Sequence, residues 1–182
     1  MARSYVEEIA LRYYQKAGYM VMPNVLFFIP RERTGKKVSG WSDIDILAYR
    51  PGELLIIQCK SFLGTRKDEE IVSEIKEWFD EAFDFCRSNE PYSKLLEEAE
   101  KAGGVKKVLV VDCAQPKRAI KMLKEAGIEV VLLDELIRRL FELVEEHIKQ
   151  AKRRGTGAVG KEEDLLLRFV MKLIMMGLTP SC

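Results

Sequence analysis

Apolar and polar positions along the chain alternate with periods that distinguish helices from strands. Residues 5–18 carry apolar side chains at helical spacing and end at Gly18, which predicts a first helix with a glycine stop. Extended apolar runs over residues 19–30, 43–50 and 54–61 predict three strands, with a Pro-Gly turn between the second and third. The chain therefore begins with a helix followed by three strands.

The rest of the chain alternates between helical and extended patterns. A long amphipathic helix is predicted over residues 68–86. Further elements are a helix at 91–103, a strand at 105–113, a helix at 115–127, a strand at 128–134 and a long helix at 135–154. A strand, helix and strand in succession favour parallel pairing. The order predicts an α/β fold, a mixed β-sheet flanked by helices with an αβββαβαβ core.

The chain is expected to divide near residue 150. Residues 1–150 form the predicted domain, 151–163 a basic, glycine-containing linker, and 164–182 a C-terminal helical extension. This last helix is apolar around almost its whole circumference, so we expect it to be buried. It either completes the core or packs against a second copy of the chain.

The linker contains a glycine pattern that resembles a phosphate-binding loop. Gly155 to Lys161 satisfies G-x-x-x-x-G-K, but Glu162 stands where a loop of this kind has Ser or Thr. The pattern also follows a predicted helix, whereas a phosphate-binding loop follows a strand. We therefore expect a linker and no nucleotide cofactor.

Charge and composition limit the function classes only weakly. Thirty Lys and Arg residues nearly cancel 29 Asp and Glu residues, so the overall charge does not indicate a nucleic-acid partner. A local basic cluster does exist in the loop predicted before the second strand, where it could contact DNA phosphates or simply face solvent. Its members are Arg31, Arg33, Lys36 and Lys37.

Cysteine and histidine usage excludes several kinds of site. The four cysteines are scattered without a pair spaced for zinc, and His147 is the single histidine. The sequence shows no secretory signal, and its longest apolar run is too short to span a bilayer. We expect a cytoplasmic protein with reduced cysteines and no membrane partner.

Polar residues interrupt the second and third predicted strands. Asp43 and Asp45 are two residues apart on one strand, and Gln58 and Lys60 are two apart on the next. Residues at this spacing share a face of a strand, so the four side chains are expected to converge if those faces coincide. Carboxylate and amide oxygens suit Mg²⁺ or Mn²⁺, although Asp43 could instead cap a strand or pair with a basic residue.

Such a cluster fits hydrolysis of a phosphodiester. A divalent ion polarises a phosphoryl oxygen and lowers the pKa of a bound water. An adjacent lysine orients that water or stabilises the charge of the transition state.

The same residues resemble the PD-(D/E)xK nuclease superfamily, which includes Mrr-type endonucleases and archaeal Holliday-junction resolvases. The resemblance rests on Glu7, eleven residues before Gly18, on Asp45 in "DIDILA", and on the run Gln58-Cys59-Lys60. It implies a restriction-endonuclease-like fold and a Mg²⁺-dependent DNA endonuclease. Asp45 is then the bridging metal ligand, with Gln58, the main-chain carbonyl of Cys59 and Glu7 as further ligands, and Lys60 is the catalytic lysine.

Several questions stay open at this level. Gln58 replaces the commoner glutamate, as in the Mrr-like branch, so a DNA-binding homologue without activity is an alternative. An RNA-directed nuclease is a further alternative, and the DNA structure that is cut cannot be read from the sequence. Trp41 could stack on a base or belong to the core or a lid. Glu7 could also be a solvated helix position. The number of subunits is open as well, although a homodimer would suit cleavage of both DNA strands.

Overall fold

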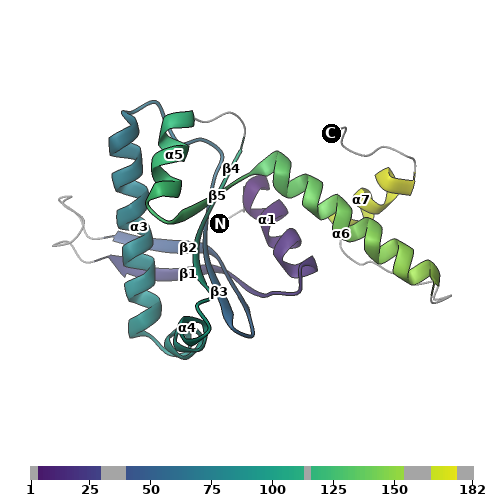
Figure 1. Ribbon diagram of the computed structural model, residues 1–182, viewed down its shortest axis with the longest axis horizontal. Helices are drawn as coiled ribbons and strands as arrows, with labels where there is room; N and C mark the ends of the chain where they lie inside the picture. The colour runs from purple at the N-terminus through teal and green to yellow at the C-terminus, as the bar shows by residue number, and fades with distance from the viewer. Residues whose placement is uncertain (1–3, 30–39, 113–115, 154–164, 176–182) are drawn as a thin grey trace.

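A five-stranded mixed sheet forms the centre of the protein (Figure 1). The computed structural model describes residues 4–29, 40–112, 116–153 and 165–175. The strand order is β1-β2-β3-β4-β5; β1 to β3 pair antiparallel, and β4 joins β3 and β5 in parallel. The strands are β1 (Met20–Ile29), β2 (Gly40–Arg50), β3 (Glu53–Lys60), β4 (Val105–Val111) and β5 (Ile128–Leu132).

Helices cover both faces of the sheet. Figure 1 shows α3, α4 and α5 on one side, and α1 and α6 on the other, with α7 beyond α6. Their bounds are α1 (Tyr5–Lys16), α3 (Asp68–Ser88), α4 (Tyr92–Lys101), α5 (Lys117–Glu125), α6 (Leu133–Arg153) and α7 (Leu165–Met175). No helix within the described ranges has the length and apolarity that crossing a membrane requires.

Each face of the sheet has its own apolar core. On the α3 side, Phe27 and Ile56 pack with Phe79 of α3. On the α1 side, Ile57 packs with Val6 of α1 and Leu136 of α6. Because both faces are covered, the central strand β3 is an almost continuous apolar run from Leu54 to Ile57, and a polar residue after it stands out.

The start of α1 is fixed by its own sequence. Ser4 is the N-cap, and its Oγ accepts a hydrogen bond from the backbone N–H of Glu7 at 3.3 Å. The same hydroxyl donates to Glu7 Oε1 at 2.8 Å. This local pairing of Ser4 with the residue three positions later holds the Glu7 side chain at the first turn of the helix.

The turn between β2 and β3 packs tightly against the start of β4. A Cβ added to Gly104 would lie 1.9 Å from the carbonyl oxygen of Gly52, so only glycine fits there. Nearby, Glu53 accepts hydrogen bonds from Tyr19 at 2.6 Å, Arg50 at 2.7 Å and Lys106 at 2.6 Å. These contacts join β2, β3 and β4 to the connection between α1 and β1 at this end of the sheet.

The predicted α/β class and mixed sheet are confirmed, and the predicted parallel pairing of the last two strands is observed. The helix predicted over 91–103 is α4, which stands between α3 and β4. The second strand, predicted over residues 43–50, is longer in the structure, because β2 already begins at Gly40. The linker 151–163 lies largely outside the described residues, as does the basic cluster between residues 31 and 37.

In the part of α7 whose side chains are described, the last helix does not complete the core of the sheet, and its packing against a second copy of the chain stays a prediction. Val170 and Met171 are buried against α6, where they join Leu140, Val144 and Ile148 in a third apolar cluster. Phe169, the residue before them, is 58% exposed. One face of α7 therefore packs on α6, away from the two cores of the sheet.

Candidate functional site

The strands β2 and β3 separate where the predicted polar residues lie. The β2–β3 register ends at the pair Ile46 and Ile57, while β3 stays paired with β4 as far as Lys60. At the fork, Asp45 Oδ2 accepts a hydrogen bond from the backbone N–H of Cys59 at 2.5 Å. The carboxylate thus satisfies an amide that has lost its strand partner, and it lies at the mouth of the fork.

A change of strand alternation places Asp45 there. Ile44 and Leu47 both face the α3-side core, although they are an odd number of positions apart, and Ile46 faces the α1 side. Asn24 and Asp45 lie between the paired residues Pro23–Ile46 and Val25–Ile44 of the β1–β2 register, and the φ of Asn24, 54°, lies in the left-handed region. The simple two-residue alternation used to predict this site therefore fails at Asp45, because both strands shift face at this pair.

The charged groups predicted for the site are nevertheless close to one another. Burial raises the pKa of Asp45 to about 7, even though the Cys59 N–H favours the ionised form. The carboxylates of Glu7 and Asp43 raise this pKa further, and Lys60 lowers it. Two acids and one lysine, contributed by α1, β2 and β3, thus influence the half-buried carboxylate of Asp45.

Gln58 is the one buried polar side chain among the described residues, at 6% exposure. Its Oε1 is enclosed, and no hydrogen-bond donor in the described part of the chain reaches it. Leaving an acceptor of this kind unsatisfied costs about 1–3 kcal/mol. Extending the β2–β3 register by one pair would place Gln58 opposite Asp45, so the unsatisfied oxygen belongs to the same fork.

The donor set fits a hard divalent ion that keeps several waters. Asp45 offers a carboxylate and Gln58 an unsatisfied amide oxygen, and Glu7 contributes a second carboxylate nearby. Within the described residues, no three His, Cys, Asp and Glu side chains form a metal cluster by themselves. Mg²⁺ commonly takes only one or two carboxylates together with water and substrate phosphate, which is compatible with so sparse a set.

The thiol of Cys59 lies on the α1 side and is not a ligand candidate. Burial, followed by the charges of Asp45 and Glu7, raises the pKa of this thiol well above its usual value. The neutral thiol form is a poor metal ligand. Any ligand role for Cys59 therefore falls to its main-chain carbonyl, as the sequence resemblance implies.

Lys60 lines a pocket of about 210 Å³ between the end of β3 and the start of α3. Arg66 lines the same pocket and pairs with Glu74 at 2.5 Å. Glu74 also lines this pocket, and the pocket still has more basic than acidic lining residues, which suits an anionic group such as a phosphate. Arg66 was not predicted from the sequence, since its place beside Lys60 depends on the fold of residues 61–67.

Asp112 is a second residue that the sequence reasoning missed. Its backbone N–H donates to the carbonyl oxygen of Lys60 at 3.1 Å, and its carboxylate accepts a hydrogen bond from the Tyr5 hydroxyl. It follows the carboxyl end of β4, directly beside the end of β3. Because ligands of open α/β sheets bind beyond the carboxyl ends of the strands, an acid after "VLVV" was an available signal.

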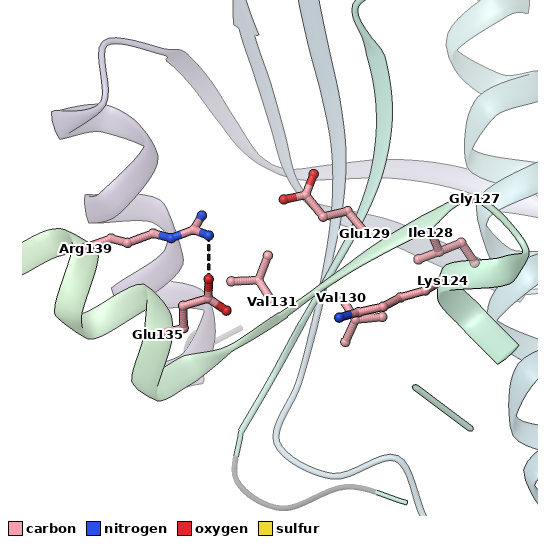
Figure 2. Close-up of a pocket in the computed structure, with 8 residues that line it drawn as sticks. All are labelled: Lys124, Gly127, Ile128, Glu129, Val130, Val131, Glu135 and Arg139. Carbon is pink, nitrogen blue, oxygen red and sulfur yellow. Dashed lines mark hydrogen bonds and ion pairs between the residues drawn. The ribbon is translucent and has the colours of Figure 1, made fainter. Parts of the chain in front are cut away.

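A larger pocket lies away from this fork. It has a volume of about 410 Å³ and follows the edge strand β5 between α5 and α6. Figure 2 shows Lys124 and Glu129 on either side of β5, and Glu135 paired with Arg139 at one end of the pocket. None of the predicted site residues lines it, so pocket size does not identify the candidate site.

Comparisons with known proteins do not assign a family. No protein-family model matches the chain, and no match was found among curated proteins. Among solved structures, the chain is similar to the crystal structure of a protein of unknown function, AF1548. The two share 14% sequence identity with a TM-score of 0.44, over 94% of this chain and 97% of the other. Function is therefore argued from the site.

Proposed function

We propose that the protein is a metal-dependent DNA endonuclease of the PD-(D/E)xK type, with a restriction-endonuclease-like fold. The proposal is supported by a helix that brings an acid to three strands, and by a fork between two of these strands that carries Asp45 and Gln58-Cys59-Lys60. Hydrolysis of a phosphodiester is the reaction for which such oxygen ligands and a lysine are suited.

Each residue has a distinct role in this proposal. Asp45, Gln58 and the carbonyl of Cys59 hold Mg²⁺ or Mn²⁺, with Glu7 as a further ligand from α1. The ion supplies Lewis-acid polarisation of the phosphate and a water of lowered pKa. Lys60 orients the attacking water and stabilises the charge that develops on the phosphoryl oxygens. Arg66, at the same pocket, binds a neighbouring phosphate.

The observation that carries the proposal is the unsatisfied oxygen of Gln58 at the fork that also carries the half-buried acid Asp45. A buried acceptor without a donor and a carboxylate whose charge is disfavoured both destabilise the metal-free fold. A divalent cation at the fork relieves both, because it accepts the lone pair of the amide and neutralises the carboxylate. A purely structural cluster gives no reason to retain either feature.

One alternative has an observation in its favour. The hydrogen bond from Cys59 N–H gives Asp45 a structural role at the end of the β2–β3 pairing, and Gln58 lacks the charge of a glutamate. Both are compatible with a DNA-binding homologue that does not cut. In that case metal has no effect on the protein, and DNA is retained intact.

Cleavage assays distinguish the two functions. The purified protein is incubated with Mg²⁺ or Mn²⁺ and labelled junction, flap, duplex and single-stranded DNA, and with RNA of matching sequence. We expect metal-dependent cleavage of DNA that falls at least about 100-fold in Lys60→Ala, the usual order for the loss of one charge-stabilising group. Asp45→Asn, which keeps an acceptor for the Cys59 N–H, should abolish this metal-dependent cleavage.

Lys76→Ala is the matched control, because Lys76 is an exposed lysine on α3 outside the site. If wild type cleaves DNA and Lys60→Ala cleaves it equally well, the catalytic role proposed for Lys60 is contradicted. DNA binding without cleavage in either metal supports the inactive homologue. Sedimentation with and without DNA tests the proposed homodimer.

A further inference from the structure

Three large apolar side chains are exposed together on the β1–β2 ribbon. Trp41 is 74% exposed, Leu26 58% and Phe28 49%. The rings of Phe28 and Trp41 pack edge to face with centroids 5.5 Å apart. We call these three residues the aromatic face. Such a group of exposed apolar side chains indicates an interaction surface.

Strand register shows that these residues form one surface. Phe28 is paired with Trp41 and Leu26 with Asp43, so all four side chains lie on the same face of the ribbon. The intervening residues face the other way: Phe27 is buried against α3, and Ser42 accepts a hydrogen bond from Trp78 of α3 at 3.2 Å. The α3 contacts thus fix the orientation that leaves Trp41 in solvent.

The aromatic face leads directly to the candidate site. Asp43 lies on it, paired with Leu26, and the charge of Asp43 raises the pKa of Asp45. A polymer that crosses the face from Trp41 past Asp43 therefore arrives at the fork. This continuity relates the surface to the substrate of the site.

We propose that the aromatic face binds unpaired bases of the nucleic acid whose backbone enters the fork. This inference rests on the proposed function and narrows its substrate to DNA with a single-stranded or unpaired segment. Exposed aromatic rings stack on bases of any sequence, and bases are available for stacking only where they are unpaired. Duplex DNA offers its bases at their edges alone.

Charge favours a nucleic acid over a second protein chain as the occupant. The connection between the paired residues Ile29 and Gly40 contains four basic residues and one acid, Glu32, in ten positions. The connection starts and ends at the end of the ribbon that carries Phe28 and Trp41. Single-strand binding proteins combine basic residues, which attract phosphates, with aromatic rings, which stack on bases, and the sequence adjoining Phe28 and Trp41 supplies both residue types.

Binding of labelled oligonucleotides in EDTA, without cleavage, tests the proposal. Affinities for a single strand and for its duplex are measured by fluorescence anisotropy for wild type and Trp41→Ala. We expect Trp41→Ala to weaken single-strand binding about tenfold, the order of one lost base stack, and to leave duplex binding within about twofold. The salt dependence of affinity should not change, because no charge is removed.

Two variants serve as controls. Trp41→Phe keeps a stacking ring and should retain most single-strand affinity. Phe169→Ala removes an exposed aromatic side chain on α7, away from the ribbon, and should leave both affinities unchanged. Circular dichroism melts establish that each variant is folded.

Three outcomes overturn the proposal. They are an unchanged single-strand affinity in Trp41→Ala, an equal loss on duplex and single strand, and a wild-type dimer that Trp41→Ala converts to monomer. Because binding is measured without cleavage, the two proposals fail separately. A protein that cuts DNA but binds single strands independently of Trp41 contradicts only the inference, whereas selective loss of binding in a protein that cuts nothing contradicts only the nuclease.

Discussion

Gln58 illustrates how one residue links the stability of the fold to the proposed chemistry. It is buried at the end of β3, and its side-chain oxygen has no donor among the described residues. The neighbouring acids explain why an uncharged residue is tolerated here. A glutamate at this position would add another negative charge beside Asp45, Glu7 and Asp43.

Replacement of Gln58 by Glu should therefore act in opposite directions with and without metal. In EDTA, we expect Gln58→Glu to lower stability by about 2 kcal/mol or more, since a buried charge is added next to like charges. In Mg²⁺, the added carboxylate is a stronger ligand, and the rise in Tm on metal addition should exceed that of wild type. Thermal melts with a titration of Mg²⁺ measure both effects.

Gln15→Glu is the control, because Gln15 is an exposed residue near the end of α1, remote from the fork. Its metal-induced change in Tm should equal that of wild type. An identical response to Mg²⁺ in wild type and Gln58→Glu would contradict a metal site at the fork.

At the scale of elements, the hairpin of β2 and β3 is held at both ends by a carboxylate. Asp45 closes the open end through Cys59, and Glu53 holds the turn end through Tyr19, Arg50 and Lys106. The two acids differ in their charge state. Burial, together with Glu7 and Asp43, raises the pKa of Asp45, whereas hydrogen bonds from Lys106, Tyr19 and Arg50 outweigh the effect of burial on Glu53 and lower its pKa to about 2.

The stability supplied by Glu53 should depend on acid pH. Its pKa falls from 4.5 to about 2 on folding, so its contribution is present above pH 4.5 and is lost as pH falls toward 2. We expect Glu53→Gln to lower the free energy of unfolding by about 2 kcal/mol at pH 7, the order of charge-assisted hydrogen bonds. Urea denaturation should show this difference shrinking between pH 4.5 and 2.

The matched control is Glu90→Gln, which removes an exposed ion pair with Lys94. Exposed pairs contribute little, so this variant should resemble wild type at every pH. A difference between wild type and Glu53→Gln that stays constant down to pH 2 would show that packing rather than charge accounts for the loss.

For the whole molecule, the arrangement of three apolar clusters separates the candidate site from the C-terminal helix. The two sheet cores position α1, β2, β3 and β4, which supply the residues of the fork. The third cluster joins α7 to α6 and touches the rest through Tyr13, which packs against both the second and third clusters. Loosening α7 should therefore leave the fork largely intact.

Hydrogen exchange of Val170→Asp checks this separation. A charge buried between α6 and α7 should release α7, so its amides exchange faster by at least about tenfold, while amides of β3 and β4 keep most of their protection. Phe169→Asp, at the adjacent exposed position, should change neither region. Equal acceleration in α7 and β3 would show that α7 unfolds together with the sheet.

The sequence by itself determined most elements of the fold and supplied most residues of the candidate site. Helical and extended periods identified the helices and strands, because an amphipathic pattern reflects the period of the local backbone. Residue chemistry singled out Asp45, Gln58 and Lys60, because polar groups on apolar strands need a reason to be there, and the family resemblance added Glu7 on the first helix.

Only the tertiary structure decided how these residues meet. The shift of face at Asn24 and Asp45, the hydrogen bond from Cys59 and the enclosure of Gln58 depend on neighbouring strands, which a two-residue period cannot describe. The pairing of β4 with β3 brings Asp112 beside Lys60, and the path of the loop after β3 brings Arg66 to the pocket that Lys60 lines. Trp41 was left undecided between base stacking and a core or lid position, and it is exposed because the contacts of Phe27 and Ser42 with α3 turn it outward. Local pattern specifies which side chains are available, whereas long-range packing specifies which of them share a site.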